Sequence, residues 1–400
     1  MRQLFRWSLW SFVIVAILGS LMRYKIGFSM PWLEQKYAQH AHSHFAFGGW
    51  VSQSLWLFIL NTFYVKLSPE KQVKMKRWLW GHLALSYGLL FGFLAQGYGT
   101  ISIVFSSFYL LWCLAMIIDF WKVIKGIGVY GSKDWFKWSM LFQLLSMAGT
   151  IMLVFTMVQK NAAAAQHLYL ASVYWYLHFT YNGWFFFACM GLFSYLIVTV
   201  WNIPPIPGKV FIVFAWSCIP AYGLSILWLQ LPLLGYILVV LAALAQMIGF
   251  FWLVKHIQKH NVIAQIGKQT LSAWFLRFIV VALGVKFCLQ LGSVIPSLSQ
   301  LAFGFRPVVI AYLHLILLSI ISVFILAFAW WGGWFYPSKI IRFALYFVLA
   351  LILGNQFLLA FQGITSLTYT LVPGINLALL IVAIMLSGVL GFLAYKQTKE

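Results

Sequence analysis

Five of the nine histidines stand where they could bind a metal ion or a haem. His40, His42 and His44 form a His-Ala-His-Ser-His run that leads into Phe-Ala-Phe-Gly-Gly-Trp, while His178 and His314 occur singly in later apolar stretches. Imidazole nitrogen is a common ligand of transition metals and of haem iron. Haem iron with two histidine ligands takes them from facing helices, so histidines at one depth on different helices predict such a site.

The same histidines have a structural alternative. A histidine inside a membrane also forms hydrogen bonds between helices, and the His-x-His-x-His run could bind adventitious zinc or copper, although residues two apart do not share a helix face. The other histidines are expected at the membrane surfaces: His256 and His260 beside lysines, His167 in an outer loop, and His82 close to the cytoplasmic face. Both interpretations of the first five remain open.

Membrane-spanning helices must position these residues. The chain of 400 residues is 64% hydrophobic and 8% charged, whereas a soluble domain is about 45–50% apolar and about 25% charged. This composition excludes a soluble globular protein, a disordered chain and a secreted disulfide scaffold. Because about 20 apolar residues cross a bilayer, we predict a single all-α transmembrane domain over residues 1–400. Its twelve helices are expected at 7–22, 44–65, 78–96, 98–120, 138–158, 170–201, 209–229, 233–254, 270–291, 308–332, 340–361 and 371–395.

The positive charges predict the orientation of these spans. Of the 26 Lys and Arg residues, Arg277 falls within a span and nineteen lie in segments assigned to the inside. Six lie in segments assigned to the outside, namely Arg23, Lys25, Lys36, Lys160, Lys286 and Arg306. Cytoplasmic loops collect Lys and Arg, so we expect a multi-pass protein of the inner (cytoplasmic) membrane with both termini cytoplasmic. The net charge of +21 then indicates orientation in a lipid bilayer, and no nucleic-acid partner is expected.

In this topology, three short motifs lie in the outer third of spans two, six and ten. Residues 42–50 resemble the H-x-H-x-x-x-x-G-[FW] entry of small, divergent members of a known superfamily. Residues 175–184 resemble the W-x-x-H-x-x-x-E-G stretch of nitric oxide reductases, and residues 312–314 lie where H-x-H is expected. Together with the twelve predicted spans, these motifs resemble the large subunit (subunit I) of the haem–copper oxidase superfamily, which includes the nitric oxide reductases.

The resemblance implies a haem protein of the respiratory chain. It assigns a low-spin, b-type haem to His314 and to either His42 or His44, and a non-haem metal ion, copper or iron, to His178. Arg306, eight residues before His314, is the candidate partner of the haem propionates. The electron donor would be cytochrome c or quinol, and small partner subunits are compatible with the family.

The sequence departs from the family at the oxygen-reducing site. Tyr312 replaces the high-spin haem ligand and could bind that iron as a phenolate. Asn182 stands where the nitric oxide reductases keep a glutamate, and residues 209–220 lack the family's His-His pair. One imidazole is a poor copper or iron site, and only Asp119, near an inner end, could serve proton uptake. We therefore expect electron transfer or a divergent oxidoreductase activity related to oxygen or nitric oxide reduction, and we assign no catalytic residue.

Two other functions are compatible with the sequence. A twelve-span transporter or channel without a cofactor would use broken helices, for which Pro220, Gly223 and Gly354 are candidates. Arg277 and Lys286 could then face an anion pathway. A cofactor-free assembly subunit would instead bind a partner through an aromatic-rich surface, because 19% of the residues are aromatic. A coloured protein would favour the haem hypothesis over both.

Overall fold

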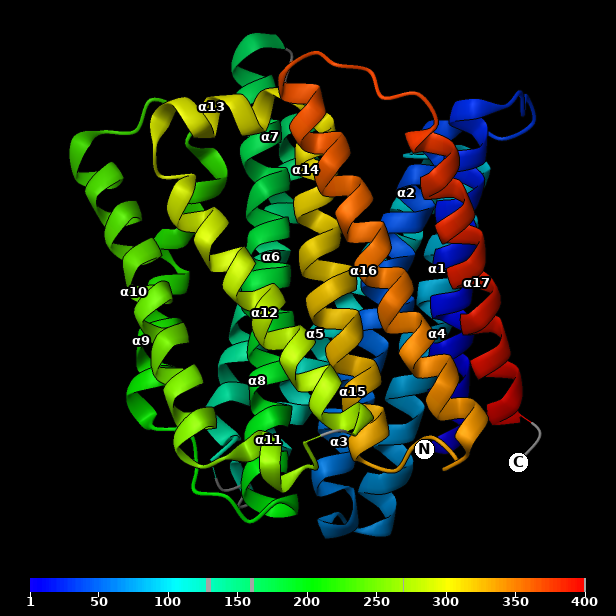
Figure 1. The fold of residues 1–400 in the computed structure, drawn as a ribbon, viewed down its shortest axis with the longest axis vertical. Helices are drawn as coiled ribbons and strands as arrows, with labels where there is room; N and C mark the ends of the chain where they lie inside the picture. Colours follow the sequence, from blue (N-terminus) through cyan, green and yellow to red (C-terminus); the bar gives the residue numbers. More distant parts are fainter. Residues whose placement is uncertain (127–130, 159–161, 269, 399–400) are drawn as a thin grey trace. The chain divides into compact units, whose positions relative to one another are not determined.

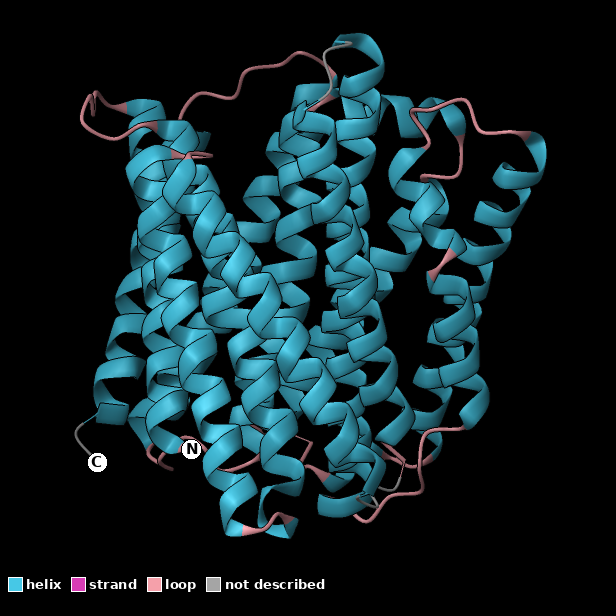
Figure 2. Cartoon of the chain, turned by 180° about the vertical axis from the view of Figure 1, so that it is seen from behind, coloured by secondary structure: helices cyan, strands magenta, loops and turns pink. Residues whose placement is uncertain are grey.

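The computed structural model describes residues 1–126, 131–158, 162–268 and 270–398, and in these ranges helices joined by loops account for the fold, without a strand (Figures 1 and 2). The all-α prediction is confirmed. The chain divides into two compact units, Met1–Ile127 with Ser322–Glu400, and Gly128–Ile321. We call them unit 1 and unit 2 and describe each by itself.

The helices of unit 1 come from both ends of the chain. They are α1 (Arg2–Gly27), α2 (Gln35–Phe45), η1 (Ala46–Ser52), α3 (Gln53–Phe63), η2 (Tyr64–Lys66), α4 (Pro69–Gln96), α5 (Thr100–Gly126), α15 (Val323–Trp331), α16 (Lys339–Leu367) and α17 (Ile375–Thr398). The first helix packs against the last, and α4 packs against both α2 and α5.

Unit 2 contains the middle of the chain. Its helices are α6 (Lys133–Val158), α7 (Ala162–His178), η3 (Phe179–Phe185), α8 (Phe186–Tyr195), η4 (Leu196–Val200), α9 (Gly208–Cys218), η5 (Pro220–Ile226), α10 (Leu233–Lys259), α11 (Val262–Gln265), α12 (Leu271–Gly292), α13 (Pro296–Gly304) and α14 (Arg306–His314). The segment η6 (Leu315–Ser322) continues α14 into α15. Within unit 2, α6 packs against α7, η3 and α8, while α10 packs against α9 and α12.

Many of these helices suit a lipid environment. Among the described residues, ten helices are long and apolar enough to cross a membrane, or eleven if the bent pair α9 and η5 is one span. A helix satisfies its backbone hydrogen bonds internally, which a lipid-embedded segment requires. The chain is therefore a multi-pass helical membrane protein in contact with lipid.

The predicted span at 44–65 is not among the ten. This segment is helical, because α2, η1 and α3 follow one another without a gap from residue 35 to residue 63. Its hydropathy is lowered by polar residues, of which Ser52, Gln53 and Ser54 are buried within the protein. Protein rather than lipid covers this helix, so it does not need a uniformly apolar surface. The count of twelve spans stays a prediction.

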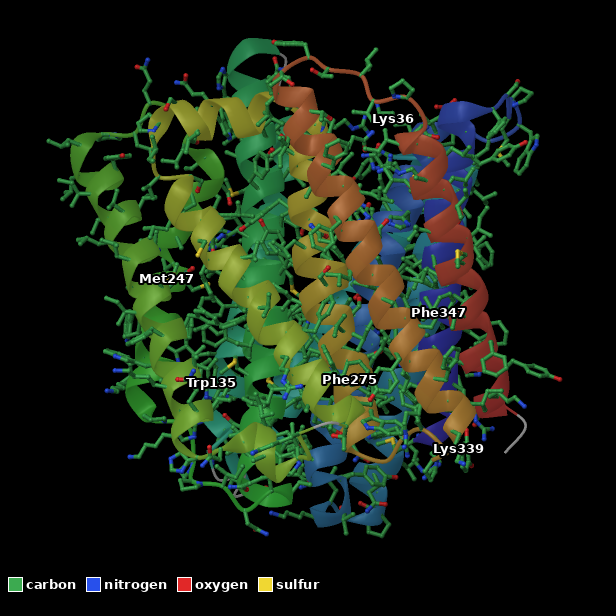
Figure 3. All side chains as sticks on the ribbon, in the orientation of Figure 1. Lys36, Trp135, Met247, Phe275, Lys339 and Phe347 are labelled. Carbon is green, nitrogen blue, oxygen red and sulfur yellow. The ribbon has the colours of Figure 1, made fainter. Side chains whose placement is uncertain are left out.

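The first turn of α1 and the last turn of α17 lie at the same end of unit 1 (Figure 1). Between α1 and α17, Ser20 Oγ and Ser387 Oγ lie 3.1 Å apart, and Arg23 donates to Asn376 Oδ1 at 3.2 Å. Lys36 and Lys339 lie at opposite ends of this unit (Figure 3), as expected for one lysine assigned to the outside and one to the inside. Lys160, from the outer set, lies outside the described residues.

Of the three candidate helix breaks, Pro220 is confirmed. The axes of α9 and η5 differ by 46° at this point, because proline has no N–H to donate and its ring clashes with the preceding turn. The prediction of a break at Gly354 is wrong, because α16 continues through this residue without interruption. Gly223 lies inside η5 and allows close packing instead: a Cβ there would lie 2.1 Å from Val239 Cγ2.

Candidate functional site

Each of the three histidine motifs adjoins a π-helical segment. η1 begins two residues after His44, η3 begins directly after His178, and η6 begins directly after His314. At the end of η1 the Gln53 N–H bonds to the Gly48 carbonyl, five residues earlier. Such wide turns change the direction of the side chains that follow and are frequent at functional sites.

His42 is held against α1 in one tautomer. Its Nδ1 lies 3.0 Å from the Val15 carbonyl oxygen, and its ring lies against Gly19, where an added Cβ would meet Cε1 at 3.5 Å. A carbonyl oxygen only accepts hydrogen bonds, so Nδ1 carries the proton and Nε2 carries the lone pair. Metal-ligating histidines commonly donate their second ring N–H to a backbone carbonyl in this way.

His44 faces a different environment, although it lies only two residues along α2. Its Nε2 lies 3.1 Å from the Tyr98 hydroxyl, and its ring stacks on Phe93 at a centroid distance of 4.2 Å. His40 meets the same Tyr98 ring edge-on at 4.6 Å. His40 and His44 therefore belong to an aromatic cluster at the end of α4, whereas the His42 ring is bonded to the backbone of α1.

His314 has the same tautomer as His42. Its Nδ1 donates to the Ile310 carbonyl oxygen of its own helix at 2.9 Å, which again leaves the lone pair on Nε2. Tyr312 is half-buried. Arg306 is the exposed first residue of α14. The predicted residues of unit 2 thus include one imidazole whose proton is fixed on Nδ1.

His178 is fixed by hydrogen bonds at both ring nitrogens. Nε2 donates to the Cys218 carbonyl oxygen at 2.8 Å, and Asn182 Nδ2 donates to Nδ1 at 3.2 Å. In an uninterrupted α-helix, the Cys218 carbonyl would accept a hydrogen bond from the Tyr222 N–H. The helix breaks at Pro220 and the Tyr222 N–H bonds to the Ile219 carbonyl, so the Cys218 carbonyl can accept from His178. A metal ion at either nitrogen would replace one of these hydrogen bonds.

His82 and Lys286 are among the polar groups whose burial the sequence prediction missed. His82 was expected at the membrane surface, but its side chain is 0% exposed and that expectation was wrong. Its Nδ1 donates to Gln53 Oε1 at 2.7 Å and its Nε2 accepts from the Tyr109 hydroxyl at 3.0 Å. The polar Gln53 inside a predicted span was the available signal, since a buried amide needs a polar partner.

Lys286 is the second such group. It was assigned to an outer segment, yet it lies within α12 and is only 4% exposed. Its ammonium lies 4.2 Å from the centre of the Phe287 ring and 5.9 Å from that of Phe186. Its position inside a predicted span was the only sequence signal of its burial.

The site residues divide between the two units. Unit 1 holds His42 and His44, whereas unit 2 holds His178, Tyr312 and His314 with Arg306. The haem pair predicted from the motifs takes one residue from each unit and stays a prediction. Two of these imidazoles, those of His42 and His314, each donate Nδ1–H to a backbone carbonyl oxygen, as metal-ligating histidines commonly do. In the described residues, no group of three or more His, Cys, Asp and Glu side chains could hold a metal ion.

Comparisons of the whole chain with protein-family models and with curated proteins give no match.

Proposed function

We propose that this chain is a haem-binding membrane protein that transfers electrons, with His42 and His314 as axial ligands of haem iron. The observation that carries the proposal is the hydrogen bond that each of the two rings donates from its Nδ1–H to a backbone carbonyl. This hydrogen bond selects the tautomer, orients the ring and raises the basicity of Nε2. The π-helical segments beside both residues support the proposal.

The remaining parts of the proposal follow from the apolar stretches, the positive charges and the family resemblance. The continuous helical run from α2 through η1 to α3 would be a further span and would complete the predicted twelve. The protein would lie in the inner membrane with both termini cytoplasmic. Bound haem would supply one-electron chemistry, with cytochrome c or quinol as the donor. Arg306 would pair with the propionates. We include no reaction at a second metal, because both nitrogens of His178 already form hydrogen bonds.

Absorption spectra of the purified protein and of three alanine variants test the ligand assignment. We expect a low-spin haem spectrum for the wild type, and its loss in both His42→Ala and His314→Ala. His44→Ala is the matched control and should keep the spectrum, because His44 is engaged with Tyr98 and Phe93. The assignment is rejected if His44→Ala loses the spectrum while His42→Ala keeps it.

A further inference from the structure

One exposed stripe of α10 changes from apolar to basic along its length. Leu241, Leu244, Ile248 and Phe251 follow one another at spacings of three and four residues, and each is 41–55% exposed. Residues at these spacings share one face of a helix. The next residue on this face, Lys255, is exposed as well. The apolar part of the stripe suits lipid chains, and Lys255 stands where such a helix meets the polar membrane surface.

An open groove lies on α10 next to this basic end. It has a volume of about 380 Å³ and a wholly apolar lining of Met247, Ile248, Phe250, Phe251 and Val254. Met247 lies in the middle part of α10 (Figure 3). From Met247 to Lys255 the helix rises about 12 Å, which is close to half the thickness of the hydrocarbon core, about 15 Å. The groove therefore follows the path of an acyl chain whose headgroup lies at Lys255.

Two lysines from different helices meet beside the groove. The ammonium of Lys255 lies 4.6 Å from the centre of the Phe251 ring, which belongs to the groove lining. The ammonium of Lys209, in the first turn of α9, lies 4.4 Å from the centre of the Trp252 ring. Because Phe251 and Trp252 are consecutive, both ammonium groups lie at the same turn of α10. Both lysines are also exposed and can reach a ligand at the protein surface.

Packing between α9 and α10 fixes the separation of the two lysines. His256 donates from Nε2 to the Pro204 carbonyl oxygen at 3.1 Å, just before α9 begins. Farther along, a Cβ at Gly249 would lie 3.2 Å from the Phe214 ring of α9. The two helices thus run antiparallel in close contact, and the positions of both lysine backbones do not depend on flexible loops.

The charge of this part of unit 2 is strongly positive. Lys259 ends α10 and Lys268 follows α11, and both are exposed. Asp134 is the only acidic residue in the sequence of unit 2, and Lys133 and Lys137 lie beside it on α6. Clusters of lysine and arginine next to a membrane helix attract anionic lipid headgroups. An anionic partner therefore complements the charge, and the apolar groove favours one that carries a hydrocarbon chain.

We propose that Lys209 and Lys255 bind the phosphate of an anionic phospholipid, and that one of its acyl chains lies in the groove on α10. The lysines supply the charge and the N–H donors, while Met247, Phe251 and Val254 supply the apolar contact. The proposal is independent of haem binding, since neither His42 nor His314 takes part.

Native mass spectrometry of the detergent-purified protein, titrated with phosphatidylglycerol or phosphatidylcholine, tests the headgroup site. The wild type should bind phosphatidylglycerol more tightly. In the double variant Lys209→Gln/Lys255→Gln this affinity should fall about thirtyfold, because each lysine near the membrane surface contributes about fivefold. Lys122→Gln is the control, because it removes an exposed lysine near the end of α5 in unit 1, and it should bind like the wild type.

A second pair of variants tests the groove. Val254→Trp places a large ring in the groove without changing either lysine, and it should weaken phosphatidylglycerol binding by about fourfold for each methylene that it displaces. Leu241→Trp adds the same ring on the same stripe, outside the groove lining, and should have no effect. Equal affinities of these two variants would reject the acyl-chain position.

Four other results would overturn the proposal. These are equal affinity of the wild type for the two lipids, unchanged binding in the double variant, an equal loss in Lys122→Gln, or displacement of phosphatidylglycerol by inorganic phosphate at the same concentration. The last result would indicate a simple anion site. If the double variant does not fold, wild-type binding is compared at low and high salt. Screening of exposed charges should weaken it, and salt-independent binding rejects the proposal.

Discussion

The hydrogen-bond partners of the rings distinguish His42 from His44 in the His-Ala-His-Ser-His run. His42 has its Nδ1–H committed to the Val15 carbonyl, whereas His44 uses Nε2 in its contact with Tyr98. A histidine that binds iron through Nε2 must have its proton on Nδ1. Two chemically identical side chains two residues apart are therefore not equivalent, and their partners explain the difference.

His82 is predicted to contribute to stability rather than to haem binding. In His82→Leu, the fully buried Gln53 loses its hydrogen bond to the ring, and the Tyr109 hydroxyl loses its acceptor. Leaving a buried polar group without a partner costs about 1–3 kcal/mol, so the free energy of unfolding in detergent should fall by that amount. His167→Leu, at an exposed position, is the control and should change it little. Equal stability of His82→Leu and the wild type would contradict this account.

Candidate histidines are visible in the sequence, but their roles depend on distant residues. His42, His178 and His314 stand out because motifs and span positions mark them. The choice between His42 and His44 needs Val15 and Tyr98, which no local pattern connects to them. The burial of His82 has the same origin, because it results from packing between helices.

At the level of elements, glycines allow α4 and α5 to approach closely. A Cβ at Gly81 would lie 2.0 Å from Trp112, one at Gly88 would lie 2.2 Å from Phe105, and one at Gly92 would lie 3.1 Å from the Ser102 backbone. The partner numbers fall as the glycine numbers rise, as expected for antiparallel helices. Small residues along one face let membrane helices pack backbone to backbone.

Gly88→Ala is therefore expected to destabilise the protein. The added methyl must displace the Phe105 ring, and overpacking of this kind costs about 1–3 kcal/mol. Gly354→Ala is the matched control, because Gly354 lies within α16 with no atom within 4 Å of an added Cβ. Melting temperatures in detergent should fall for Gly88→Ala and stay equal or rise for Gly354→Ala. A drop of the same size in both variants would contradict the close packing of α4 and α5.

The helices were predictable because hydrophobic stretches of membrane length are long and distinct. The local geometry within them was harder to predict. The bend at Pro220 follows from proline chemistry, but the π-helical segments η1, η3 and η6 depend on the side chains packed around them. Gly183 in η3 is an example, since a Cβ there would lie 2.5 Å from Phe142 Cβ of α6.

For the whole molecule, composition and charge predict a multi-pass membrane protein, and the described helices agree with that coarse description. The division into two units was not apparent from the sequence, because unit 1 joins residues 1–127 with residues 322–400. Such long-range packing leaves no mark on local hydropathy.

The haem content of the purified wild-type protein tests the central claim most directly. The protein should be produced in a host supplied with haem and analysed by the pyridine haemochromogen method together with protein quantification. We predict a b-type haem at about one per chain, in keeping with one pair of histidine ligands. A colourless protein with less than about a tenth of a haem per chain would contradict the account.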